Sequence, residues 1–454
     1  MLLIAQMANI SPLTVIQPYM PVFYVAFVVT FLLTPMMRYF AHKYGVVDEP
    51  DGGRKIHSQP IAYLGGVATF LGWVAGVVAS VIVVPSGAEQ SLTATVLVPP
   101  GIILGAGAVM ICGLLDDCFN LPPKFKLFGQ FIGAACLFFM NVDQNGFLGA
   151  RHDMADMIVA PFEHHGLIPF IQASHFYPMF ASIFCAALVV FIIMSTCNAL
   201  NLLDGMDGLC GGVTGIMALG YLILSVYLAT GNLAYSGSTS VSSLDPARIT
   251  MSLALLGAVL GFLPFNFNPA NIFLGDTGSM FLGFVCGAMM VMFGNDGIFR
   301  WFLASIVIFG LPMLDTFLAI VRRKISGRPV FSPDSGHFHH FLLKRGMSVK
   351  KSALVSYALA VMFVSFALVI VIIPTTLALG IYLVLFGWLI VAAFKMGMVQ
   401  FGLPLKLSTA EPSGSQASVS AAVLAPEEKR SAPVITKIEP GTYIKGSEPG
   451  LMGK

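Results

Sequence analysis

Side chains that could carry chemistry gather in four short polar segments between long apolar runs of this sequence. These are the pair Asp116-Asp117, the series Asn198, Asn201, Asp204 and Asp207, the single Asp276, and the histidines His337, His339 and His340. Carboxylates next to apolar helices are costly to keep unless they face water, a metal ion or a substrate. If the four segments open on one side of a membrane, they are candidates for a single active site.

The carboxylates of Asp116 and Asp117 stand at the end of an apolar helix, where acidic side chains oppose the helix dipole. A counter-charge or a function is needed to explain them, and such a pair could hold a metal ion or polarise a nucleophile. The alternative is a solvated helix end, followed by two prolines and the cations Lys124 and Lys126.

An oxygen-bearing side chain recurs every third residue from Asn198 to Asp207. Helical neighbours at this spacing share a face, so at least the first three could form one stripe before Gly205 and Gly208 loosen the backbone. Oxygen ligands suit a hard cation such as magnesium, which usually keeps water and substrate phosphate in its shell. The alternative, that these side chains only cap neighbouring helices, fits less well with their number and with the two glycines.

Asp276 lies in the stretch Gly275–Ser279, directly before another apolar run. It could serve as a helix N-cap, which is a favoured role for Asp. The free N–H groups of the same helix end could instead bind a phosphate. Asn266, Asn268 and Asn271 add further amide groups upstream, and the sequence leaves both roles open.

The three histidines follow a stretch rich in cations, which includes Arg322, Arg323, Lys324 and Arg328. They could bind zinc, form a structural turn, or contact a diphosphate or a sugar. The cations and the oxygen-rich segments favour the anion contact. The chain has no Walker-type loop, dinucleotide fingerprint or nucleophile elbow.

Long apolar stretches must position these segments. Of 454 residues, 57% are hydrophobic and 10% are charged, and the mean hydropathy is +0.85. Soluble domains carry roughly 25% charged residues. A spanning helix needs about 20 apolar residues, which predicts an all-α polytopic membrane protein with about eleven transmembrane helices. The predicted spans are 20–38, 61–84, 96–115, 127–142, 177–198, 211–230, 249–266, 278–293, 299–320, 353–373 and 376–396.

Two polar regions complete the predicted organisation. Residues 1–400 are expected to form the membrane domain, with a polar insertion at 143–176, and 401–454 a disordered cytoplasmic tail. The seven cysteines lack CxxC pairs and indicate small buried apolar positions rather than disulfides or zinc ligands. The N-terminus lacks the features of a cleaved signal peptide.

The Lys and Arg residues predict the orientation, because cytoplasmic loops retain them. With the N-terminus outside, 21 of the 24 lie on the inner side, and only Arg151, Arg248 and Arg300 lie outside. This orientation places all four polar segments on the cytoplasmic face.

Five ordered motifs between about residues 20 and 395 resemble the polyprenyl-phosphate N-acetylhexosamine-1-phosphate transferases. The motifs are Arg54–Pro60 with Gly65-Gly66, Asp116-Asp117, Asn198–Asp207, Gly275–Ser279, and Phe331–Asp334 with His337–His340. The HxHH form after Ser-Pro-Asp is similar to the branch that loads N-acetylglucosamine-1-phosphate onto undecaprenyl phosphate for teichoic acid, O-antigen or arabinogalactan synthesis. The Pro-Leu-His-His-His stretch typical of the peptidoglycan branch is absent, while Ser335-Gly336 departs from the usual GlcNAc-branch residues.

The resemblance implies a role for each site residue. Asn201 and Asp276 would ligate magnesium, with manganese as an alternative, and Asp116, Asp117 and Asp276 would be catalytic. The implied substrate-binding residues are Lys126 and Arg323 at phosphate oxygens, Asp204 and Asp207 at the nucleotide, Asn198, and His337, His339 and His340 at the sugar nucleotide.

The implied reaction transfers N-acetylhexosamine-1-phosphate, by this resemblance N-acetylglucosamine-1-phosphate, from its UDP-sugar to undecaprenyl phosphate at the bacterial plasma membrane. A phosphate monoester is nearly doubly charged at neutral pH, which favours its direct attack on the β-phosphorus with release of UMP. A phospho-enzyme on Asp117 or Asp276 stays open. A peptidoglycan-type transferase, a secondary transporter and a non-catalytic scaffold are alternative functions. We expect membrane lipids but no nucleic acid as partners, and a homodimer stays open.

Overall fold

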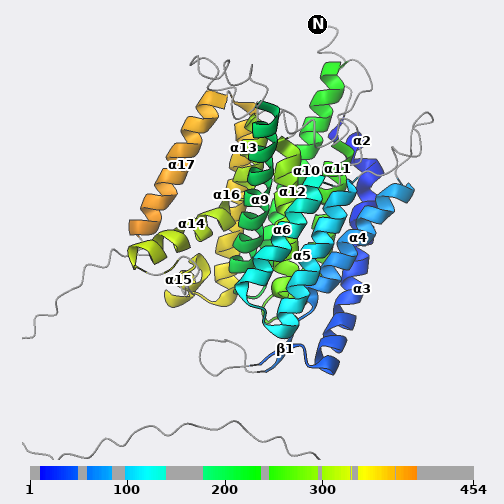
Figure 1. Ribbon diagram of the computed structural model, residues 1–454, viewed down its shortest axis with the longest axis vertical. Helices are drawn as coiled ribbons and strands as arrows, with labels where there is room; N and C mark the ends of the chain where they lie inside the picture. Colours follow the sequence, from blue (N-terminus) through cyan, green and yellow to red (C-terminus); the bar gives the residue numbers. More distant parts are fainter. Residues whose placement is uncertain are drawn as a thin grey trace, which may run out of the picture. The chain divides into compact units, whose positions relative to one another are not determined.

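The computed structural model describes residues 11–49, 59–83, 98–139, 177–236, 245–294, 299–327, 329, 336–373 and 375–395. The predicted insertion at 143–176, the predicted tail at 401–454, and the motif residues 54–58 and 331–335 lie outside the described residues. Nearly all regular structure in the described part is helical (Figure 1).

The long N-terminal helices are α3 (Met20–Tyr44), preceded by α2 (Pro12–Ile16) and the short helix η1 (Gln17–Tyr19), then α4 (Gly65–Val83), α5 (Pro100–Phe119) and α6 (Pro123–Phe139). The central helices are α9 (Tyr177–Leu203), α10 (Leu209–Ser236), α11 (Asp245–Asn266) and α12 (Gly275–Gly294). They are followed by α13 (Phe299–Ile308), α14 (Gly310–Ile325), α15 (Phe338–Lys344), α16 (Val349–Ile372) and α17 (Thr375–Lys395).

The helix lengths confirm the all-α polytopic membrane fold. Within the described residues, nine helical segments are long and apolar enough to cross a membrane, or ten if one bent pair is counted as a span. The predicted span 127–142 corresponds to α6, whose 17 residues are at the lower limit of the usual length for a membrane helix.

The ninth predicted span, 299–320, is broken rather than straight. α13 and α14 meet at Phe309 with a bend of 72°, and α14 runs sideways from the bundle (Figure 1). Pro312 has no N–H to offer the carbonyl of Ile308, so the hydrogen bonding of α13 cannot continue through this point. Hydropathy alone does not detect such a bend.

The helix α12 is the centre of the membrane domain. Every residue of α12 except Asp276 is buried, and α4, α5 and α9 pack around it. Small residues allow close approach between membrane helices. At Gly113 of α5, an added Cβ would lie 2.6 Å from the carbonyl oxygen of Asp276. The end of α5 therefore lies directly against the start of α12.

The polar segments meet at one end of the bundle, which we call the polar end. Here α3, α5, α9 and α11 finish, and α4, α6, α10, α12 and α16 begin, next to α15 and the sheet (lower part of Figure 1). The antiparallel sheet pairs β1 (Val47–Asp48) with β2 (Ile61–Ala62). Ala62 also accepts a hydrogen bond from the N–H of Phe273 at 2.8 Å. This contact fixes the segment that leads into α12.

Candidate active site

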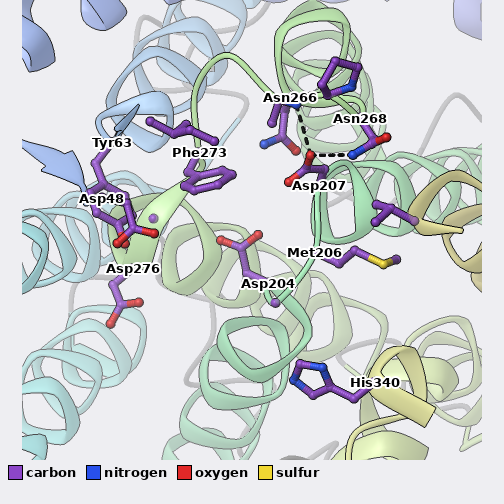
Figure 2. Close-up of a pocket in the computed structure, with 16 residues that line it drawn as sticks. Asp48, Tyr63, Asp204, Met206, Asp207, Asn266, Asn268, Phe273, Asp276 and His340 are labelled. Atoms are coloured by element: carbon purple, nitrogen blue, oxygen red, sulfur yellow. Dashed lines mark hydrogen bonds between the residues drawn. The ribbon is translucent and has the colours of Figure 1, made fainter. Parts of the chain in front are cut away.

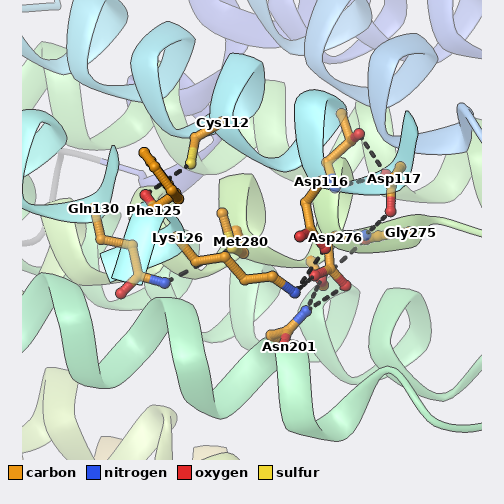
Figure 3. Close-up of polar contacts among 12 residues, drawn as sticks. Cys112, Asp116, Asp117, Phe125, Lys126, Gln130, Asn201, Gly275, Asp276 and Met280 are labelled. Atoms are coloured by element: carbon orange, nitrogen blue, oxygen red, sulfur yellow. Dashed lines mark hydrogen bonds and ion pairs between the residues drawn. The ribbon is translucent and has the colours of Figure 1, made fainter. Parts of the chain in front are cut away.

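Asp117 holds the first turn of α12, although it belongs to α5. Its carboxylate accepts hydrogen bonds from the N–H of Asp276 at 2.8 Å, from the N–H of Thr277 at 3.0 Å and from the hydroxyl of Thr277 at 2.6 Å (Figure 3). Gly275 lies so close to this carboxylate that an added Cβ would be 2.5 Å from Asp117 Oδ2. Asp117 is thus an N-cap supplied by a neighbouring helix, satisfying donors that a helix start leaves free.

Asp116, Lys126 and Asp276 form a charged cluster beside this cap. The ammonium of Lys126 lies 2.6 Å from Asp116 Oδ2 and also contacts Asp276 Oδ2 (Figure 3). Asn201 donates from its amide to Asp276 Oδ1 at 2.8 Å and to Ser279 Oγ at 3.1 Å. Four helices, α5, α6, α9 and α12, therefore each contribute one polar side chain to the same point.

The cluster has the donor types that suit a hard divalent cation. Asp116 Oδ1 is buried without a hydrogen-bond partner among the described residues. The carboxylate of Asp276 lies close to that of Asp116, because both contact the ammonium of Lys126. The amide oxygen of Asn201 is a further oxygen donor at the same point. No group of three or more His, Cys, Asp or Glu side chains in the described part of the chain is arranged to hold a metal ion by itself. Magnesium commonly uses one or two carboxylates and takes its other ligands from water and phosphate, so the set fits that ion.

A cavity of about 400 Å³ adjoins the cluster at the polar end. Asp276 and Gly275 line it from α12, and Asp204, Asp207 and His340 line it from other segments (Figure 2). This volume falls within the usual range of small-molecule sites. Asp276 therefore belongs both to the charged cluster and to the cavity wall.

Aromatic rings form one wall of the cavity. The rings of Tyr63 and Phe273 have centroids 6.1 Å apart and are tilted by 54° (Figure 2). Burial, and secondarily Asp48, raise the pKa of Tyr63, so its hydroxyl stays protonated at neutral pH. The wall thus offers flat apolar surface and a hydroxyl donor.

Asp204 is the carboxylate of the cavity with the strongest electrostatic perturbation. Burial is the main cause that raises its pKa well above the usual range, and the nearby charges of Asp276, Asp117 and Asp207 add to it. A cation that enters this part of the cavity would therefore favour the ionised form of Asp204, because it offsets the negative charge nearby.

Asp207 is hydrogen-bonded to the segment between α11 and α12. Its Oδ2 accepts from the amide of Asn268 at 2.8 Å and from the N–H of Ala270 at 3.0 Å. Asn266 bridges the same region, since its Oδ1 accepts from the N–H of Gly208 at 3.1 Å and its amide donates to the carbonyl of Ile272 at 3.0 Å. Asp207 thus shapes the cavity wall by fixing the segment between α11 and α12.

The three histidines have different surroundings. His337 Nδ1 lies 2.9 Å from Asp315 Oδ2, and Asp315 Oδ1 accepts from the N–H of Phe338 at 2.8 Å. His339 is 1% exposed, and neither of its ring nitrogens has a hydrogen-bond partner among the described residues. Burial, and secondarily His340, lower the pKa of His339 to about 3. Only His340 of the three lines the cavity.

The structure brings most of the predicted site residues together but separates some of them. The half-buried Asn198 donates a hydrogen bond to Gln130, and Arg323 is buried in the last turn of α14. Neither residue lines the cavity. Sequence reasoning missed Asp315, although an acidic residue inside the apolar stretch 299–320 was an available signal. It also missed Gln130, which has no distinguishing signal in the sequence.

Comparisons with known proteins match this chain to one group of membrane transferases. Residues 99–294 match the sequence model of glycosyl transferase family 4. A Bacillus subtilis protein named "Probable undecaprenyl-phosphate N-acetylglucosaminyl 1-phosphate transferase" is 32% identical over 386 residues, which are 83% of this chain and 92% of that relative. The decaprenyl-phosphate N-acetylglucosaminephosphotransferase of Mycolicibacterium smegmatis is 33% identical over 73% of this chain and 77% of its own length. A phospho-N-acetylmuramoyl-pentapeptide-transferase of Desulforamulus reducens is 32% identical over 63% of this chain and 75% of its own length.

Proposed function

Because this chain belongs to glycosyl transferase family 4, we propose that it transfers N-acetylglucosamine-1-phosphate from UDP-N-acetylglucosamine to undecaprenyl phosphate. The products are UMP and a lipid-linked diphosphate sugar, which starts a cell-envelope polysaccharide. The names of relatives that match most of this chain support the lipid and the sugar.

The observation that carries the proposal is the position of Asp276. Its carboxylate contacts Lys126 in the charged cluster, and the same residue lines the cavity. A sugar nucleotide in the cavity would thereby place its diphosphate beside a fixed ammonium group. Tyr63 and Phe273 offer the flat surface on which a uracil ring can stack.

We place the polar end in the cytoplasm of a bacterial plasma membrane. This assignment rests on the bias of Lys and Arg in the sequence, which predicts 21 of the 24 on that side. It puts the cavity in the compartment that contains UDP-sugars. The charged cluster lies at the end of the bundle, where a lipid phosphate at the membrane surface can reach it.

The chemistry needs charge neutralisation more than it needs a base. An oxygen of the lipid phosphate attacks the β-phosphorus, the bond from that phosphorus to the α–β bridging oxygen breaks, and UMP leaves with the electron pair. Lys126 orients and neutralises phosphate oxygens, and Asp116 holds the ammonium in place. Asp276 and Asn201, joined by Asp116, would hold magnesium or manganese, which when bound neutralises charge on the diphosphate.

The contacts of Asp117 favour direct attack over a phospho-enzyme on this residue. Both of its oxygens accept hydrogen bonds from the start of α12, which lowers their nucleophilicity. A sugar-phosphoryl enzyme trapped with UDP-N-acetylglucosamine alone, before any lipid is added, would overturn the one-step mechanism.

The central test is a transfer assay on the purified protein. Radiolabelled UDP-N-acetylglucosamine, undecaprenyl phosphate and magnesium should yield label in the lipid fraction together with UMP. Asp276→Asn should lower turnover by at least about 100-fold, whereas a chain truncated after residue 405 should keep it. If label never enters the lipid, or enters equally in Asp276→Asn, the proposed function is wrong.

A peptidoglycan-type donor is the second candidate, because three relatives with that activity in their names match 41%, 63% and 70% of this chain. A donor panel on one enzyme preparation separates the two. UDP-N-acetylglucosamine should be turned over, and UDP-N-acetylmuramoyl-pentapeptide should not. Preference for the pentapeptide donor would replace the first candidate with the second.

A further inference from the structure

A fully buried glutamine lies one helical turn below the charged cluster. Gln130 of α6 is 0% exposed, although it carries two polar atoms. Its Oε1 accepts a hydrogen bond from the amide of Asn198 at 2.8 Å. Its own amide donates to the sulfur of Met280 at 3.7 Å (Figure 3). Gln130 therefore connects α6 to both α9 and α12.

The partners of Gln130 repeat the helices of the charged cluster. Lys126 and Gln130 are four residues apart on α6, as are Asp276 and Met280 on α12. Helical neighbours at this spacing lie on one face, one turn apart. The third helix, α9, supplies Asn201 to the cluster and, three residues earlier, Asn198 to the glutamine.

The three helices thus carry two stacked polar layers. The outer layer joins Lys126, Asp276 and Asn201, and the inner layer joins Gln130, Met280 and Asn198. On α6 and α12 the inner residues are the more buried, since Gln130 and Met280 are 0% and 1% exposed whereas the side chains of Lys126 and Asp276 are 26% and 24% exposed. Asn198 and Asn201 of α9 are both half-buried.

We propose that Gln130 is a positioning residue of the transferase, which sets the register of α6 against α9 and α12 and so fixes the ammonium of Lys126 at the charged cluster. Asn198 belongs to the same inner layer and acts through Gln130 rather than by touching the substrate. This inference rests on the proposed function and deepens it.

Packing alone does not account for an amide at this position. A buried polar group needs a partner, and an apolar side chain of the same size would avoid that need. In a membrane helix an interhelical hydrogen bond also fixes rotation and depth, which apolar contacts leave freer. The position of Lys126 depends on the rotation and the depth of α6, because this helix begins at Pro123, only three residues before Lys126.

The test compares Gln130→Leu with wild type in the transfer assay, using UDP-N-acetylglucosamine and undecaprenyl phosphate in lipid nanodiscs. Misplacement of a reacting group by about 1 Å can cost roughly 100-fold in rate. We therefore expect kcat per folded enzyme to fall about 10- to 100-fold. The KM for the sugar nucleotide should stay within about threefold, because neither Gln130 nor Asn198 lines the cavity.

A matched control is Thr196→Val, because Thr196 is a buried polar residue of α9 whose hydroxyl, among the described residues, donates to the carbonyl of Ile193 in its own helix. We expect this variant to keep kcat. If Gln130→Leu lowers the folded yield but leaves kcat per folded enzyme unchanged, its role is structural only and the inference is wrong.

A double-mutant cycle tests whether the two amides act as one unit. Gln130→Leu, Asn198→Leu and the double variant should lower kcat by the same factor. Factors that multiply in the double variant would show independent roles and overturn the inference. If Gln130→Leu does not fold, Asn198→Leu alone decides, since it removes the other end of the same bond. A wild-type protein without transfer activity would instead refute the proposed function.

Discussion

Removal of the Asp117 carboxylate should destabilise the protein more than it alters the chemistry directly. In Asp117→Ala, the N–H groups of Asp276 and Thr277 and the hydroxyl of Thr277 lose their acceptor. The first turn of α12 then loses its cap, and Asp276 moves with that turn. Turnover should fall as a consequence of lost position.

The size of the effect follows from the three hydrogen bonds. Bonds to a charged acceptor contribute about 1.5–3 kcal/mol each where both groups are buried. Asp117 is half-buried, so water can replace part of what is lost, and loss of a helix cap alone costs about 1 kcal/mol. We expect Asp117→Ala to lower the free energy of unfolding by about 3 kcal/mol. Asp117→Asn keeps one acceptor oxygen and should cost about half as much.

The assay is thermal unfolding of the detergent-solubilised variants, paired with turnover in the transfer assay. Asp116→Asn is the matched control, because Asp116 makes its ion pair with Lys126 rather than with the start of α12. It should unfold near the wild-type temperature and still lose most turnover. If Asp117→Ala unfolds at the wild-type temperature and loses turnover as fully as Asp116→Asn, the cap argument is wrong and Asp117 acts on the substrate.

Three further predictions concern the segments around the cavity. Asp315→Ala removes the hydrogen-bond partner of His337 and of the N–H of Phe338, so turnover should fall at least about tenfold and the unfolding temperature should also fall. Unchanged turnover and unfolding temperature would contradict a role of Asp315 in holding this segment. The folded protein keeps His339 neutral with a pKa of about 3, whereas the unfolded chain binds a proton near pH 6.5, so the free energy of unfolding falls as the pH drops. Between pH 7.5 and 5.5, the free energy of unfolding of His339→Gln should fall by about 1.4 kcal/mol less than that of wild type, measured in paired thermal melts. Gly205→Ala places a Cβ 2.6 Å from His339 Nε2, so the KM for the sugar nucleotide should rise several-fold, and equal KM values would refute the contact.

The sequence was sufficient for the class of fold and for most of its helices. Long apolar runs predicted α3, α4, α5 and the later spans, because burial in lipid selects composition over a whole helix. The break between α13 and α14 was not predictable in this way, since it depends on Pro312 and leaves the hydropathy of 299–320 unchanged.

The candidate site was predictable as a set of residues but not as a set of contacts. The alternation of helices is enough to bring Asp116, Asn201 and Asp276 to one end. Which oxygen meets which donor depends on helix rotation and depth, and hydropathy contains neither. Asp315 is an example of what hydropathy cannot predict. Its sequence neighbours are apolar, so hydropathy includes it in a predicted span, yet its carboxylate contacts His337.

The placement of two carboxylates at the end of α5 can now be explained in electrostatic terms. The C-terminus of a helix carries partial negative charge, so Asp116 and Asp117 are unfavourable there in isolation. Each has its own compensation in the fold. Asp117 accepts from the first turn of α12, the positive end of a second helix dipole, and Asp116 pairs with the ammonium of Lys126. Gly113 allows the end of α5 to touch the start of α12. As a result, Asp276 both donates its N–H to Asp117 and contacts Lys126 through its carboxylate. Because Asp276 also lines the cavity, the charged cluster lies beside the cavity.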